Sequence, residues 1–139
     1  AINQIASIQE RQCATTLKIA PFLPPSFGDS VEIQRVVQNL LDNAVRVSNP
    51  DQPIILEVVS LGDTYIKVSV RDKGPGIAPD EKEKLFHRFI QGRNRRGKVG
   101  LGLYLCRQII QAHAGTINVE SKLGEGSTFW FTLPVVRLT

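Results

Sequence analysis

Hydrophobic residues recur every three to four positions along residues 29–48, which is the spacing of one buried face of a helix. This face consists of Ile33, Val36, Val37, Leu40, Leu41, Ala44 and Val47. Asp29 stands three residues before Glu32 at the start of the run, an arrangement typical of a capping box. The pattern therefore predicts a helix that begins directly after Asp29.

Strands are predicted where apolar and polar residues alternate between turn residues. Residues 53–60 and 65–72 have this character and flank the turn 61–64, so they are expected to form a hairpin. Two more strands are expected near 116–121 and 127–135, joined by the glycine-containing turn LGEGS.

A short helix is predicted near 79–86 and a longer one from about 101 to 113, whereas the proline-containing stretch 20–29 resembles a linker. Helices on one face of an antiparallel-rich sheet form an α+β two-layer sandwich. With 139 residues, 42% of them hydrophobic, the chain can bury about two thirds of its unfolded surface in one domain.

Composition narrows the classes of function only slightly. The net charge of +4 suits a nucleic acid, a nucleotide phosphate or an acidic protein. Cys13 and Cys106 lie far apart, so neither a disulfide framework nor a cysteine zinc site is expected, and a reducing cytoplasm fits. No apolar run approaches the length of a membrane helix. The sequence contains no methionine, which indicates a segment of a longer protein.

Two asparagines lie on the predicted helix 29–48. Asn39 and Asn43 are four residues apart, at the edge of the apolar face, and Arg46 follows about one turn later. An amide oxygen is a neutral hard ligand that suits Mg²⁺, which keeps several waters and takes other ligands from substrate phosphates. Taken alone, the pair fits two solvated or capping asparagines better.

Asp72 ends a predicted strand and is followed by the sequence KGPGI. Glycine at 74 and 76 allows unusual backbone angles and a close approach of a ligand, while Pro75 stiffens the turn. A carboxylate here can accept hydrogen bonds from an exocyclic amino group such as that of adenine. An ordinary Asx or Gly-Pro turn, with Asp72 as the cap, explains the same residues equally well.

Gly100 and Gly102 stand where the second long helix is predicted to start, and the amino end of a helix is a favourable place for phosphate. Residues 92–99 match most of the Walker A pattern, but Val99 replaces the Ser or Thr that would hold Mg²⁺. The glycines also fail the GxGxxG pattern, so neither a P-loop nor a Rossmann site is expected.

The stretch 91–100 is basic and contains Arg93, Arg95, Arg96 and Lys98. A solvated loop or a nucleic-acid patch would explain the charges, but without neighbouring stacked aromatic residues nucleotide phosphates are favoured. Phe86 and Phe89 are interpreted as core anchors at the base of this loop. His87 and His113 lack a third ligand, which disfavours a metal–histidine centre.

Five short motifs, taken in order along the chain, resemble the N, G1, F, G2 and G3 boxes of the ATP-binding catalytic domain of sensor histidine kinases. They are NLLDNA at 39–44, DKGPGI at 72–77, LFHRF at 85–89, GLGL at 100–103 and GEGSTFWF at 124–131. The resemblance covers about residues 14 to 135. It implies the Bergerat fold, a mixed sheet with helices on one face, and the binding of ATP with Mg²⁺.

The resemblance also implies roles for individual residues. Asp72 would accept the adenine amino group, with Gly76 beside the base and Ser127 supporting the purine site. Asn39 would be the Mg²⁺ ligand, and Asn43 would contact a phosphate or the metal.

The glycines Gly100 and Gly102 would bring backbone N–H groups to the phosphates, and residues 88–99 would be a mobile ATP lid hinged near Phe89 and Gly97. The residues expected to contact the nucleotide are Asp72, Gly74, Gly76, Ile77, Phe89, Lys98, Gly100, Leu101, Gly102, Leu103 and Ser127. Those expected to serve phosphoryl transfer are Asn39, Asn43 and Arg46.

Some positions depart from the family pattern. Arg46 and Val47 replace the usual lysine and aromatic residue, and Lys98 and Val99 replace the common Gly-Thr before GLGL. Arginine can still neutralise a phosphate, although it does not reproduce lysine. Lid closure and nucleotide affinity are therefore left open.

Related ATPases such as DNA gyrase carry a glutamate general base at the position of Asn39, and an amide cannot take a proton from water. The resemblance therefore implies phosphoryl transfer to a histidine on a separate dimerisation domain of the same protein, with neither His87 nor His113 as acceptor. Residues 1–12 would be the trailing connection from that domain and 13–139 the catalytic domain.

The partners implied are that dimerisation domain and, indirectly, a response regulator, with no nucleic acid. The segment itself is expected to be monomeric and cytoplasmic, in a homodimeric parent that is either soluble or membrane-anchored. A nucleotide sensor without catalysis, a nucleic-acid-binding module using the RNRRGK loop and an anti-sigma-type serine kinase are the alternatives.

Overall fold

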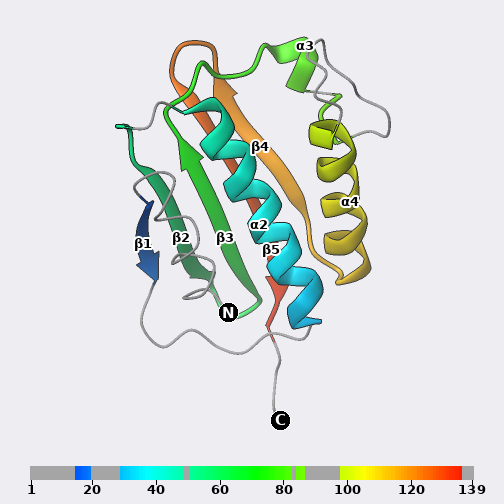
Figure 1. The fold of residues 1–139 in the computed structure, drawn as a ribbon. Helices are drawn as coiled ribbons and strands as arrows, with labels where there is room; N and C mark the ends of the chain where they lie inside the picture. The colour runs from blue at the N-terminus through cyan, green and yellow to red at the C-terminus, as the bar shows by residue number, and fades with distance from the viewer. Residues whose placement is uncertain (1–14, 20–28, 49–50, 83, 87–97, 136–139) are drawn as a thin grey trace.

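The computed structural model describes residues 15–19, 29–48, 51–82, 84–86 and 98–135 (Figure 1). Along the chain the elements are β1 (Thr15–Ile19), α2 (Ser30–Val47), β2 (Ile54–Leu61), β3 (Tyr65–Asp72), α3 (Pro79–Lys82), α4 (Lys98–Ala112), β4 (Ile117–Lys122) and β5 (Gly126–Pro134). In the described part of the chain, no helix combines the length and the apolar character needed to cross a membrane.

The strands form one mixed sheet in the order β1-β2-β3-β5-β4. The predicted hairpin of β2 and β3 and the antiparallel pair of β4 and β5 are confirmed, and β3 pairs antiparallel with β5. The strand β1 was not predicted; it pairs parallel with β2, starting with Thr15 opposite Ile54. A short parallel edge strand depends on a partner far along the chain, so its local sequence carries little signal.

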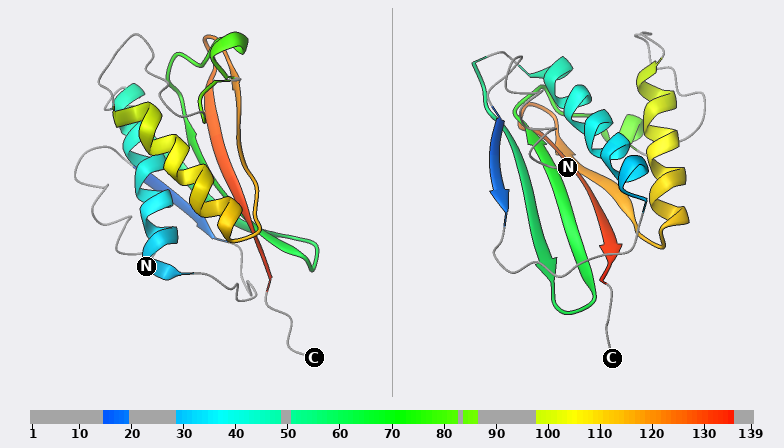
Figure 2. Two further views of the ribbon diagram at one scale, coloured as in Figure 1. Left: turned by 90° about the vertical axis from the view of Figure 1, so that its right-hand side faces the viewer. Right: turned by 60° about the horizontal axis from the view of Figure 1, so that its bottom comes forward.

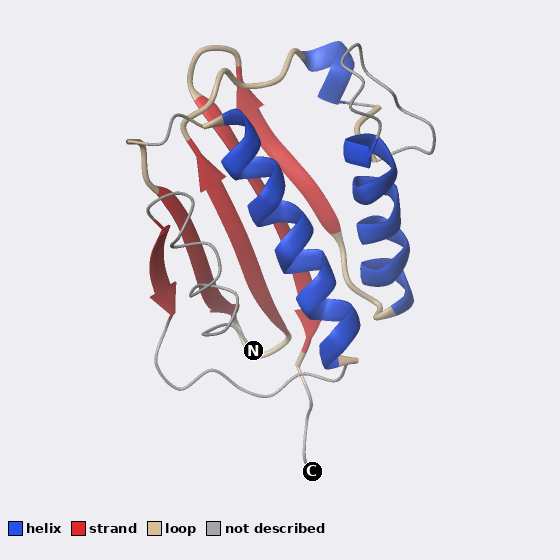
Figure 3. Ribbon diagram, in the orientation of Figure 1, coloured by secondary structure: helices blue, strands red, loops and turns tan. Residues whose placement is uncertain are grey.

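The sheet and two long helices form two layers. Both α2 and α4 pack on the same face of the sheet, as the side view shows (Figure 2, left; Figure 3). Alternate strand residues point toward the helices, so that Val68 on β3, Phe131 on β5 and Ile117 on β4 form one row across the sheet. These side chains and those on the inner face of α2 are buried, which confirms the predicted α+β sandwich.

The two predicted helix boundaries near the basic stretch were wrong. The helix α3 ends at Lys82 instead of near 86, because the chain then turns to bring Phe86 into the core. The Phe86 and Phe129 rings meet edge to face with centroids 6.2 Å apart, so Phe86 is a core anchor as predicted. The helix α4 begins at Lys98, three residues before the predicted start, and so includes both glycines of GLGL.

A histidine completes the cap of α2. Asp29 Oδ1 accepts from the N–H groups of Val31 and Glu32, which is one half of the predicted capping box; the other half, a bond from the N–H of Asp29 to the Glu32 side chain, is replaced. The N–H of Asp29, however, donates to Nε2 of His113 at 3.0 Å, and Nδ1 of that ring lies 2.7 Å from the carbonyl oxygen of Ile109. His113 therefore joins the start of α2 to the end of α4, a structural role that the sequence did not indicate.

Candidate functional site

Polar residues replace apolar ones where three neighbouring strands meet at one end of the sheet. On β3 the inward row continues from Val70 to Asp72, which lies opposite Ser127 on β5, and Ser127 lies opposite Ser121 on β4. Asp72 is 3% exposed and Ser127 is 6% exposed. The alternation of each strand therefore directs a buried carboxylate and two hydroxyl groups to the helix-covered side, at the end where α2 finishes and α4 begins (Figure 1).

The carboxylate of Asp72 is only half satisfied by the described residues. Its Oδ1 accepts from the N–H of Gly74 at 2.9 Å, so the Asx-turn interpretation is correct for this oxygen. Its Oδ2 is buried and has no partner among the described residues. Burial raises the pKa of Asp72, and the backbone N–H groups of Gly74 and Ser127 oppose this rise. A buried acceptor without a partner favours a ligand that donates a hydrogen bond.

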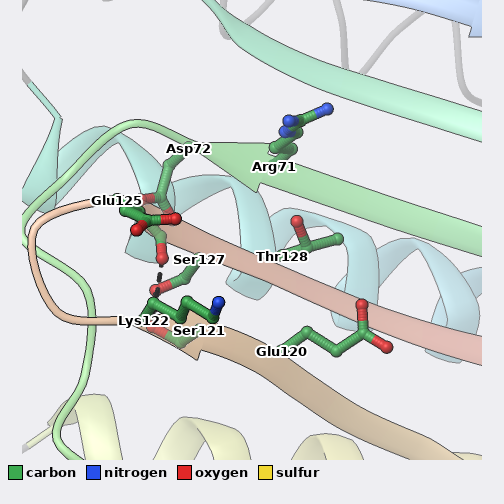
Figure 4. A pocket seen from close by; sticks show the side chains of 9 residues that line it. Arg71, Asp72, Glu120, Ser121, Lys122, Glu125, Ser127 and Thr128 are labelled. Atoms are coloured by element: carbon green, nitrogen blue, oxygen red, sulfur yellow. Dashed lines mark hydrogen bonds between the residues drawn. The ribbon is translucent and has the colours of Figure 1, made fainter.

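Ser121 holds three segments of this site together. Its Oγ accepts from the N–H of Ile77 at 2.8 Å, donates to the carbonyl oxygen of Gly126 at 3.1 Å and lies 2.8 Å from Oγ of Ser127. The close-up shows Ser121 and Ser127 on adjacent strands (Figure 4). Ser121 was not among the predicted site residues. The strand alternation does indicate it, because it is the polar residue at an inward position after Ile117 and Val119.

Two glycines allow the loop after Asp72 to pack directly on the turn between β4 and β5. Gly76 has φ +80°, and a Cβ atom there would lie 2.1 Å from the carbonyl oxygen of Lys122. Gly126 has φ +90°, and its Cβ would lie 2.2 Å from the carbonyl oxygen of Asp72. Both conformations and both contacts exclude a side chain. The N–H of Gly124 also donates to the carbonyl oxygen of Pro75 at 2.7 Å, so this wall of the site is rigidly connected.

The second part of the site lies between the two long helices. Asn39 on α2 is partly buried and donates from Nδ2 to Sγ of Cys106 on α4 at 3.6 Å. Its Oδ1 lies 3.8 Å from the position that a Cβ on Gly102 would occupy. Burial raises the pKa of the Cys106 thiol to about 11, so this group is a neutral acceptor. The N and G2 motifs are thus brought together, with the amide oxygen toward the first turns of α4.

The remaining candidate residues divide into three groups. Asn43 on α2 is half-buried, and Arg46 is exposed in the last turn of this helix. The next residue, Val47, lies so close to Gly74 that a Cβ atom on Gly74 would be 2.9 Å from it. Leu103 is buried in the core. The predicted nucleotide contact Phe89 lies outside the described residues, as do the side chains of Lys98 and Leu101, while Gly100 lies in α4.

A hollow of about 170 Å³ opens on the opposite side of the same strand ends. It is lined by the outward-facing row of Arg71, Thr128 and Glu120 and by Lys122 and Glu125. The site residues Asp72, Ser121 and Ser127, together with Gly126, also contribute to its lining (Figure 4). Apart from Asp72, its cations and carboxylates are mixed and exposed to solvent. The buried oxygen without a partner belongs to the helix-covered side, so that side is the better candidate for ligand binding.

Comparisons with known proteins agree with this geometry. The sequence model of the "Histidine kinase-, DNA gyrase B-, and HSP90-like ATPase" family matches residues 28–137. The adaptive-response sensory kinase SasA of Gloeothece citriformis is 38% identical over 131 residues, which are 93% of this chain and 33% of that protein. The chain therefore spans about a third of the length of this relative.

Solved structures of histidine kinases share the fold. The catalytic domain of histidine kinase ThkA, in a nucleotide-free form, has a TM-score of 0.84 and 27% identity, covering 98% of this chain and 92% of that one. Full-length ShkA in complex with AMPPNP has a TM-score of 0.84 and 25% identity, covering 99% of this chain and 30% of that one. The predicted Bergerat fold is confirmed, and the chain belongs to the histidine kinase-, DNA gyrase B- and HSP90-like ATPase family, as the ATP-binding catalytic domain of a sensor histidine kinase.

Proposed function

We propose that this chain binds ATP with Mg²⁺ and transfers the γ-phosphoryl group to a histidine on a separate dimerisation domain of the same protein. The observation that carries the proposal is the buried Oδ2 of Asp72, which has no partner in the described part of the chain. Adenine carries an exocyclic amino group that would donate to this oxygen. Gly76 would lie beside the base, and the hydroxyl of Ser127 would support the same end of the purine.

Asn39 and Gly102 support a phosphate-binding role for the helix side. Among the described residues outside α4's own backbone, the nearest atoms to a Cβ at Gly102 belong to Asn39, at 3.8 and 3.9 Å, so the fold leaves room for alanine. Glycine nevertheless occupies this helical position, where it costs about 1 kcal/mol relative to alanine. An approach of phosphate groups to the backbone would explain this choice.

The donor set fits Mg²⁺. The amide oxygen of Asn39 is a hard, neutral ligand, and Asn43 lies one turn further along α2. When bound, Mg²⁺ would neutralise part of the phosphate charge, and the exposed Arg46 would add to this at the end of α2. Gly74, Ile77, Leu103 and the predicted contacts Phe89, Lys98, Gly100 and Leu101 would complete the nucleotide environment.

In this proposal the nucleophile comes from a separate dimerisation domain. Because an amide is not a base, Asn39 cannot activate water, so the site would hold the nucleotide without rapid hydrolysis. A neutral imidazole nitrogen of the dimerisation domain would form the new N–P bond while the bond from the γ-phosphorus to the bridging oxygen breaks. ADP leaves with that electron pair, and the imidazole proton passes to solvent. The chain's own residues contribute positioning and electrostatic stabilisation.

Titration calorimetry tests the nucleotide site. The Asp72→Asn variant should bind ATP with Mg²⁺ about 10- to 100-fold more weakly, because a charge-assisted hydrogen bond is worth about 1.5–3 kcal/mol. Glu120→Gln is the matched control, since it removes an exposed carboxylate from the outer face of β4. Equal ATP affinity in wild type and Asp72→Asn would contradict the adenine assignment.

Phosphoryl transfer needs a separate measurement. The wild-type chain, mixed with a histidine-containing dimerisation domain and γ-labelled ATP, should label that domain, and Asp72→Asn should label it far more slowly at subsaturating ATP. ATP binding without any transfer would instead favour a nucleotide-sensing module that lacks kinase activity.

A further inference from the structure

The hydrogen bonds of Ser121 fix the direction in which the neighbouring hydroxyl of Ser127 can act. A serine hydroxyl has one proton and two acceptor lone pairs. A backbone N–H can only donate, so Ser121 Oγ accepts from Ile77. A backbone carbonyl can only accept, so the single proton of Ser121 is used on Gly126. With the proton of Ser121 assigned to Gly126, the remaining 2.8 Å contact, in which either oxygen could donate, is assigned as a donation from Ser127 to Ser121.

Ser127 is consequently left with lone pairs only. Its proton is committed to Ser121, and its side chain lies on the inward face directly opposite Asp72 in the β3–β5 register. Oδ2 of Asp72, which has no partner in the described part of the chain, is also an acceptor when the carboxyl group is ionised. This end of the site therefore offers acceptors from two adjacent strands and no hydroxyl donor from Ser127.

We infer that Ser121 is a specificity-determining residue: by taking the proton of Ser127, it makes the purine site accept amino groups and reject keto groups. The inference rests on the proposed function, since it assumes that the purine lies against Asp72 and Ser127. The 6-amino group of adenine has protons to give to these acceptors. The 6-keto oxygen of guanine or hypoxanthine would face lone pairs, and buried acceptors without donors are unfavourable. Ser121 is a positioning residue here, because it acts through Ser127.

Removing Ser121 should weaken this preference. In Ser121→Ala the proton of Ser127 is released, so the hydroxyl can rotate and donate to a keto oxygen. ITP is the suitable probe, because its base carries the 6-keto group without the 2-amino group of guanine. The ratio of ATP affinity to ITP affinity, measured by calorimetry with Mg²⁺, should fall about tenfold in Ser121→Ala. Ser121→Thr keeps the hydroxyl and should keep the wild-type ratio.

A double-mutant cycle separates this effect from a loosened loop. In a Ser127→Ala background the Ser121→Ala substitution should leave the ratio unchanged, because no hydroxyl is left to redirect. An equal fall of the ratio in both backgrounds would overturn the inference, since the change would then come from the packing around Ile77. A wild-type ratio that persists in Ser121→Ala would overturn it as well.

Ser127→Ala by itself provides a test that does not need Ser121→Ala to fold. If Ser127 acts as an acceptor, its loss should lower the ATP to ITP ratio, because ATP loses a partner and ITP loses an unfavourable neighbour. A ratio that rises or stays constant would mean that Ser127 donates or does not face the base, and would overturn the inference. If Asp72→Asn bound ATP as tightly as wild type, the proposed function itself would have failed.

Discussion

The two halves of the candidate site are built in different ways. The half proposed to bind adenine, called the adenine half below, lies where β3 ends at Asp72 and β5 starts next to Ser127. It is fixed by backbone contacts, two positive-φ glycines and the three bonds of Ser121. The half proposed to bind the phosphates, called the phosphate half below, is a contact between α2 and α4, in which the bond from Asn39 to the Cys106 sulfur is long, at 3.6 Å. We therefore expect the adenine half to hold a base in one fixed position and the phosphate half to adjust to the position of a phosphate.

The strongest way to break the adenine half is to add a methyl group to its backbone. Gly76→Ala forces positive φ on alanine and places Cβ 2.1 Å from the Lys122 carbonyl oxygen, so it should lower the free energy of unfolding by about 3 kcal/mol or more. Gly124→Ala is the matched control, because Gly124 has φ +82° but no atom within 4 Å of its Cβ.

Urea unfolding followed by the fluorescence of Trp130, the single tryptophan, would measure both variants. Gly124→Ala should show the conformational strain alone, about 1 kcal/mol. Equal losses in the two variants would contradict the close packing of the Asp72 loop on the β4–β5 turn.

The same substitution in the phosphate half should act in the opposite direction on stability. Gly102→Ala adds helix propensity at a position with space, so the free energy of unfolding should rise by up to about 1 kcal/mol. ATP affinity should nevertheless fall about tenfold, because the backbone could no longer approach the phosphates. Gln108→Ala, on the exposed side of α4, should leave the affinity unchanged. A destabilised Gly102→Ala variant would show that the fold requires this glycine.

The pH dependence of the adenine half should take opposite signs for folding and for binding. Burial raises the pKa of Asp72 in the folded chain above its ordinary value of 3.8. At pH values between this ordinary value and the raised pKa, the folded chain therefore binds more protons than the unfolded chain. Its contribution to the free energy of unfolding is therefore present at low pH and declines as pH rises through this window. ATP affinity should increase over the same window, since the ionised carboxylate is the acceptor.

Asp72→Asn isolates this contribution, because the amide does not titrate. Subtracting its urea-unfolding profile from that of wild type should reveal the decline, and its ATP affinity should lose the same pH step. A variant whose stability and affinity follow pH as in wild type would contradict the titration of Asp72 in this window.

The prediction with the smallest effect on the protein concerns the contact between α2 and α4, which the reactivity of the Cys106 thiol measures. With a pKa of about 11, the buried Cys106 thiol should react with iodoacetamide at pH 8 roughly 10²-fold more slowly than an ordinary cysteine. The experiment needs a Cys13→Ser background and urea-unfolded chain as the fast control. Labelling of the folded chain at the unfolded rate would show that α2 and α4 separate readily.

Local sequence patterns were enough to establish the main elements and the direction in which their residues face. Helical spacing identified the buried face of α2, although the prediction was wrong for Val47, which is 41% exposed in the last turn of the helix. Strand alternation placed Asp72 on the same side as Val68 and Val70, because these periodicities are local properties of the backbone. The order of five motifs identified the family that the comparisons show. The individual roles of Asn39, Asn43 and Arg46 in transfer remain predictions.

Tertiary contacts determined which of these residues form hydrogen bonds with each other. The bond from Ile77 to Ser121 spans 44 positions, that from Asn39 to Cys106 spans 67, and that from Asp29 to His113 spans 84. The edge strand β1 and the Asp72 oxygen that has no partner among the described residues likewise became visible only in the folded chain. Such contacts depend on strand register and helix packing, which bring distant segments together and which no short stretch of sequence encodes.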